Sequence, residues 1–110
     1  MSVIDEIAAE RQRQVEVERH GSEHDDDHEH GELVKAAMAY CQAASIPRDD
    51  TSVLAGKPPL YWPWEPRWWK PKNKRRDLIR AAALIVAEIE RIDRADAAKT
   101  EAIRLGRGRA

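Results

Sequence analysis

Apolar residues recur at three- and four-residue steps in three separate stretches of the chain, which is the period of an amphipathic α-helix. The clearest stretch covers 74–98 and follows Asn73, a favoured helix N-cap residue. Whether this helix continues through Ile103 is left open by the pattern. Its repeating apolar positions are Leu78, Ala82, Ile85, Ile89 and Ile92.

Two further helices are predicted over 3–18 and 32–45. In the first, Ser2 and Asp5 form a pair close to a capping box. Its apolar residues mark an amphipathic but very polar helix. In the second, Val34 and Met38 widen the apolar stripe of the helix, and the stripe itself contains Leu33, Ala37, Tyr40, Cys41 and Ala44.

The segments between these helices differ sharply from each other. Residues 21–31 are polar, with Gly at both ends, and predict a loop. Residues 46–73 hold all six prolines and all four tryptophans, so this long connector is expected to pack rather than to be disordered. No convincing strand pattern exists. We predict an all-α domain over 1–105, with three main helices, the connector 46–73 packed over them, and a basic tail at 106–110.

Composition and charge limit the function classes. The chain has 110 residues, a formal charge of −1 and no Phe, so Ala-rich and aliphatic helices must supply most of a modest core. A small core favours a homo-oligomer. Balanced charge argues against binding extended nucleic acid or a membrane surface. The single cysteine, and the lack of a membrane span or signal peptide, predict a cytoplasmic protein.

Charge is unevenly distributed along the chain. The segment 16–30 carries seven acids against one Arg, and 57–80 carries eight cations against two acids. Four histidines lie in or beside the acidic segment, among three consecutive Asp. Three interpretations stay open for it: a solvated loop, a metal site, or a hydrogen-bonding role in which His24 and Asp25 cap or bridge helices. The set Glu88, Glu90 and Asp93 is expected to be mainly a solvated face, with a metal–carboxylate site as the alternative.

The stretch 61–76 combines four tryptophans with six basic residues. Such a mixture can stack on a base and neutralise phosphates, or it can supply the bulky side chains of a small core. We expect two of the four tryptophans in the core. A solvated basic rim is an equally good interpretation of the cations. Cys41 lies in an apolar helical pattern without basic neighbours, so we do not expect a catalytic thiol.

Three short motifs resemble a known group of proteins. They are the sequences Glu10-Arg-Gln-Arg-Gln14, Glu23-His-Asp-Asp26 and the Ala-rich stretch 82–93. Together they are similar to phage and prophage proteins related to the MazG-type all-α nucleotide pyrophosphohydrolases. The resemblance implies Mg²⁺ held by carboxylates on facing helices. Here the corresponding stretch 31–40 carries one acid, Glu32, which is too few oxygen ligands for two Mg²⁺.

These observations predict a small phage-type protein that binds a nucleotide-like anion without hydrolysing it and without a cofactor. Trp68 or Trp69 would stack the base. The ligand could be a nucleotide signal of host antiviral defence, as the resemblance implies. Phosphate contacts are expected from Arg67, Lys70, Arg75 and Arg76, and the pocket would be organised by Glu10, Arg13, His24 and Asp25.

Two alternatives remain. The first is a divergent Mg²⁺-dependent nucleotide pyrophosphohydrolase. The second is a phage inhibitor that docks on a host defence protein through the acidic segment 16–30, used as a phosphate mimic. The enzyme would use Glu32, Asp25, Asp26, Glu88 and Asp93.

Overall fold

The computed structural model describes residues 2–16, 31–46 and 57–106, and these residues form helices and connections without a strand. The predicted all-α class is confirmed. Residues 17–30 of the acidic segment and 107–110 of the basic tail lie outside the described residues. The elements are helix α1 (Val3–Glu16), helix α3 (Glu32–Ser45), the 3-10 turn η1 (Pro66–Trp68) and helix α4 (Lys74–Arg104).

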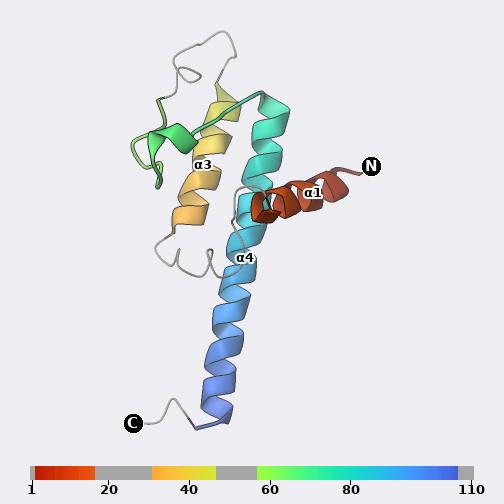
Figure 1. Ribbon diagram of the computed structural model, residues 1–110, viewed down its shortest axis with the longest axis vertical. Helices are drawn as coiled ribbons and strands as arrows, with labels where there is room; N and C mark the ends of the chain where they lie inside the picture. The colour runs from red at the N-terminus through yellow and green to blue at the C-terminus, as the bar shows by residue number, and fades with distance from the viewer. Residues whose placement is uncertain (1, 17–30, 47–56, 107–110) are drawn as a thin grey trace.

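Helix α4 runs along the long axis of the molecule, and the other helices pack against it (Figure 1). Helix α3 runs antiparallel to it along its N-terminal half, and α1 crosses that half from another side. The described part of the connector, 57–73, folds over α3, and the C-terminal half of α4 extends beyond the other elements. The molecule is therefore elongated, measuring 57 × 35 × 22 Å.

The core lies between α3, α4 and the connector. Small side chains on the two facing helices allow their backbones to approach closely, and Leu33, Leu84 and two tryptophans fill the space that remains. Eight of the fourteen buried apolar residues are alanines. The contributors are Leu33, Ala36, Ala37, Ala39, Tyr40 and Ala43 from α3, Ala81, Leu84 and Ala87 from α4, and Trp62 and Trp69 from the connector.

The helix bounds agree closely with the sequence patterns. Helix α3 spans the predicted 32–45, and α1 begins at Val3 with the expected capping box, in which Ser2 Oγ accepts from the Asp5 amide at 3.1 Å. Helix α4 is longer than predicted and includes Ile103. It ends at Arg104, and Gly106 follows the C-cap residue with a φ of 76°, in the left-handed region that favours glycine.

The apolar stripe of α4 is where burial departs from the pattern. Leu78, Ile85, Ile89 and Ile92 are between 43% and 52% exposed. The buried face consists of other residues, because α1 and α3 both pack against α4 and neither covers the stripe. The same correction applies to α3, on which Val34, Met38 and Cys41 are exposed instead of extending the buried stripe.

Helix α4 begins at the predicted cap. The Asn73 side chain accepts a hydrogen bond from the Arg76 amide at 2.9 Å, and Asp77 Oδ1 accepts from the Lys72 amide at 2.8 Å. Both bonds satisfy backbone N–H groups around the helix start. In the described part of the chain, no helix combines the length and the apolar character needed to cross a membrane.

Removal of this cap should weaken the fold measurably. We expect Asn73→Ala to lower the free energy of unfolding by about 1 kcal/mol, because the Arg76 amide loses its acceptor. Urea denaturation followed by circular dichroism measures the loss. Asn73→Ser is the control, since serine caps about as well as asparagine. An equal loss in both variants would contradict the capping role.

Candidate functional site

The connector is anchored by two buried aromatic rings. Trp62 and Trp69 lie 5.0 Å apart between ring centroids, and both contact Tyr40 of α3, at 5.7 and 4.9 Å. The Trp62 indole N–H donates to the Glu65 carbonyl at 3.2 Å. Trp64 is partly buried against Trp62. The expectation that two of the four tryptophans belong to the core is thus confirmed.

Trp68 is the tryptophan that the fold leaves exposed, at 54%, whereas its neighbour Trp69 is 4% exposed. The turn η1 directs the two side chains to different environments. The amides of Trp68 and Trp69 donate to the carbonyls of Glu65 and Pro66, both at 3.0 Å. Of the two tryptophans predicted to stack a base, only Trp68 offers an accessible ring. Trp69 is enclosed by the core and has no such role in this structure.

A guanidinium group lies over the exposed indole. Arg67 Cζ is 5.0 Å from the Trp68 ring centroid, within the range of a cation–π contact. Arg67 Nε also lies 3.0 Å from Glu65 Oε2, and both side chains are largely exposed. Lys70, Lys72 and Lys74 follow along the chain and are exposed as well. We call Arg67, Trp68 and Lys70 the Trp68 surface.

Arg75 and Arg76 have a different environment from Arg67. Arg75 Nη2 lies 2.5 Å from Glu6 Oε2, and Arg76 Nη2 donates to Glu10 Oε1, so both arginines join α4 to α1. In the first pair the Arg75 side chain is exposed, while in the second the Glu10 carboxylate is fully buried. These two predicted phosphate ligands are therefore already engaged in contacts between helices.

The Glu10 carboxylate is the centre of a buried polar cluster. Arg13 donates to both of its oxygens at 2.8 Å, and Gln14 Nε2 donates at 3.2 Å. Burial by itself raises the pKa of Glu10, but the hydrogen bond and charge of Arg13, with the charges of Arg76 and Arg80, outweigh it and hold the pKa below its usual value. The cluster thus keeps a buried carboxylate ionised between α1 and α4.

The structure brings only part of the predicted site together. Glu10, Arg13 and Arg76 meet in the buried cluster, Arg67 and Trp68 meet at the connector, and His24 and Asp25 lie outside the described residues. Within the same described residues, no group of three or more His, Cys, Asp or Glu side chains could hold a metal ion. Glu88 pairs with Arg91 at 2.5 Å, and Asp93 is exposed.

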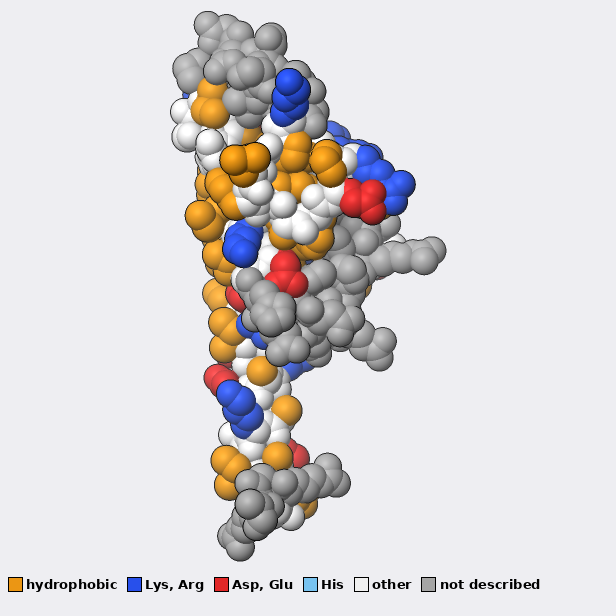
Figure 2. Space-filling model, turned by 90° about the vertical axis from the view of Figure 1, so that its left-hand side faces the viewer, with side chains coloured by type: hydrophobic (Ala, Val, Ile, Leu, Met, Phe, Trp, Pro, Cys, Tyr) orange, Lys and Arg blue, Asp and Glu red, His pale blue; other side chains and the backbone are white. Residues whose placement is uncertain are grey.

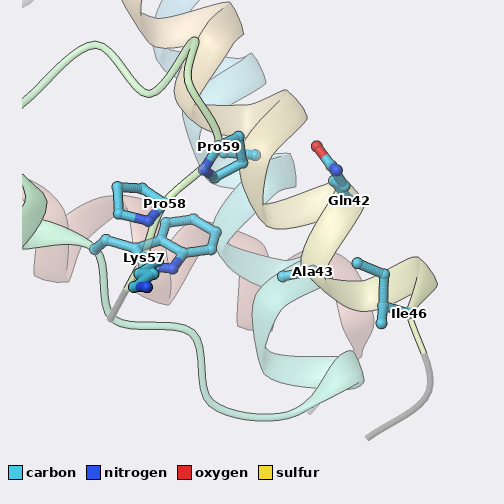
Figure 3. Close-up of a pocket in the computed structure, with 8 residues that line it drawn as sticks. Gln42, Ala43, Ile46, Lys57, Pro58 and Pro59 are labelled. Atoms are coloured by element: carbon cyan, nitrogen blue, oxygen red, sulfur yellow. The ribbon is translucent and has the colours of Figure 1, made fainter. Parts of the chain in front are cut away.

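A pocket of about 290 Å³ lies between α3 and the start of the described connector (Figure 3). Gln42 and Ala43 of α3 and its C-cap residue Ile46 line one side, and Lys57, Pro58 and Pro59 line it from the connector. Ala39 and Trp69 complete the lining. Sequence reasoning did not single out this pocket. The adjacent prolines next to a lone lysine are the only signal that could have marked it.

Comparison of the chain with protein-family models, with curated proteins and with solved structures finds no match.

Proposed function

We propose that the protein binds a nucleotide-like phosphate ligand at the Trp68 surface and does not hydrolyse it. The observation that carries this proposal is the exposed Trp68 ring with the Arg67 guanidinium 5.0 Å from its centroid. The ring is held from both sides along the chain, because the indole of buried Trp62 donates to the carbonyl of Glu65, the N-cap of η1, and η1 leads into buried Trp69. A preorganised aromatic ring beside a cation suits a base joined to a phosphate.

The surrounding charges define the expected contacts. The base would stack on Trp68, and the phosphate would contact Arg67 and Lys70. Arg67 can change partner easily, because its pair with Glu65 is exposed and surface pairs contribute only about 0–1 kcal/mol. Arg75 could join them by leaving Glu6. Arg76 is a poorer candidate, because its departure would leave the buried Glu10 with one cation fewer.

Binding without turnover follows from the scarcity of metal ligands on α3, where the stretch 31–40 contains Glu32 as its one acid. A ligand held in this way would be sequestered. We infer from the resemblance to phage proteins that this happens in the cytoplasm of a host bacterium and that the ligand is a signal of antiviral defence. The homo-oligomer expected from the small core belongs to the same proposal.

Titration calorimetry with a panel of mono-, di- and cyclic nucleotides tests the proposal. Loss of a base stack is worth about 1–3 kcal/mol, so Trp68→Ala should weaken binding by roughly 5- to 150-fold. Arg67→Glu should weaken it further by repelling the phosphate. The matched control is Leu60→Ala, a fully exposed connector residue outside the Trp68 surface.

Three results would count against the proposal. They are the absence of binding across the panel, wild-type affinity in Trp68→Ala, and release of pyrophosphate when Mg²⁺ and a nucleoside triphosphate are added. The last result would instead favour the divergent pyrophosphohydrolase.

A further inference from the structure

An apolar face of α4 is exposed along much of the helix. From Leu78 to Ile92, its apolar residues follow one another at steps of four, three, four and three positions, which is the repeat of a coiled-coil seam. The same spacing continues through Asp96 and Lys99 to Ile103, which is also exposed. We call Leu78, Ala82, Ile85, Ile89 and Ile92 the α4 seam.

The seam lies on the side of α4 that neither neighbouring helix covers. α1 contacts α4 through Arg75, Arg76 and Glu90, and the core with α3 includes Ala81 and Leu84. At 100° per residue the seam occupies the third side. Val34 and Met38 of α3 are also exposed, and Figure 2 shows hydrophobic side chains along one edge of the molecule.

We propose that a second copy of this chain covers the α4 seam, with the two α4 helices packed antiparallel about a two-fold axis. A heptad seam fits a helix that carries the same repeat, because each apolar side chain then inserts between four residues of its partner. The chain itself supplies such a helix. A two-fold interface also uses the same patch on both copies, which a single exposed seam provides.

Charge decides the orientation of the two helices. The N-terminal region 70–80 carries six cations against one acid, whereas 88–104 carries four cations against five acids. A parallel pair would place the two basic regions side by side, and would set Asp96 against Asp96 and Lys99 against Lys99. An antiparallel pair separates the two basic regions and places each beside the nearly neutral C-terminal half of its partner, which avoids that repulsion.

Sedimentation velocity on the full chain tests the interface. The wild type should sediment as a dimer of the 12.6 kDa chain. The double variant Ile85→Glu and Ile89→Glu places two charges in the seam of each copy. The dissociation constant of the dimer should therefore rise by roughly a hundredfold or more. Its circular dichroism should remain helical, because both positions are about half exposed in the monomer. The matched control is Ile4→Glu on α1, at an exposed position outside the seam, which should remain dimeric.

A monomeric wild type would overturn the proposal, and so would a double variant that dimerises like the wild type. Loss of the dimer in Ile4→Glu alone would show that the interface lies on α1, and would also contradict the proposal. Orientation is measured by spin labels at Ile103→Cys in a Cys41→Ser background. Antiparallel helices crossing near Ile85 place the two labels about 50 Å apart, at about 1.5 Å per residue. A short distance would overturn the antiparallel arrangement.

Discussion

Trp69→Ala is expected to lower the free energy of unfolding by about 3–5 kcal/mol, the usual cost of truncating a buried large aromatic side chain. Trp69 is 4% exposed and contacts both Tyr40 and Trp62, so its removal leaves a cavity where the connector meets α3. Among the described residues, none accepts a hydrogen bond from the Trp69 indole N–H, and therefore no lost hydrogen bond adds to the cost. Guanidinium denaturation followed by circular dichroism measures the change.

Trp68→Ala is the matched control, because it removes the same atoms from the adjacent residue. Trp68 is 54% exposed and lies outside the core cluster, so its loss should cost less than about 1 kcal/mol. Equal losses from the two variants would show that Trp68 is also part of the core, and would remove the accessible ring on which nucleotide binding rests. A small loss from Trp69→Ala would contradict the packing of the connector on α3.

Helix positions could be read from the sequence because their signals are local. The Ser2–Asp5 capping box, the Asn73 cap and the apolar period of 32–45 each act within a few residues, and each has the expected structural counterpart. The C-terminal end of α4 was underestimated because alanine-rich, charged sequence continues a helix without any apolar stripe. The pair between Arg104 and Glu101, with atoms 2.5 Å apart, supports this last turn.

Burial was harder to predict than helix position. Periodicity identifies an apolar stripe but not the element that covers it, and in α4 the Leu78–Ile92 stripe is exposed while polar residues such as Asp77 and Arg80 are buried. Arg80 donates to the Lys70 carbonyl at 2.5 Å and thereby ties the connector to α4. Such long-range contacts depend on how three helices meet, and no local pattern encodes them.

The candidate site shows the same division. Trp68 and Trp69 have identical side chains in adjacent positions, and only the η1 turn decides which one enters the core. Likewise, charge alone could not separate Arg67, which lies over an exposed ring, from Arg76, which reaches a buried carboxylate. The sequence indicated the right region and residue types, while their distribution between core and surface required the tertiary structure.

Glu10→Gln is expected to lower the free energy of unfolding by about 2–3 kcal/mol near neutral pH, because the variant keeps the shape of the side chain but loses its charge. The Glu10 carboxylate is buried and accepts from Arg13, Gln14 and Arg76. Hydrogen bonds to an ionised group are among the stronger ones, and the neutral amide would leave two arginines with a weaker acceptor.

The loss should depend on pH in a definite direction. The pKa of Glu10 in the folded protein lies below its usual value, whereas in the unfolded chain it returns to about 4.3. The stabilisation is therefore fully present above that pH and disappears as the pH falls through the folded-state pKa. The difference between wild type and Glu10→Gln should shrink over the same range, because protonated Glu10 is neutral like glutamine.

Urea denaturation of both proteins across this pH range measures the effect, with Glu6→Gln as the matched control. Glu6 lies on the same helix and its hydrogen bond to Arg75 lowers its pKa, but Arg75 is exposed and Glu6 is partly exposed, whereas the Glu10 carboxylate is buried. Glu6→Gln should therefore cost far less than Glu10→Gln. A pH-independent cost at position 10 would mean that the charge of the buried cluster does not hold α1 against α4. An equal cost at position 6 would mean that the buried pair contributes no more than the pair between Glu6 and Arg75.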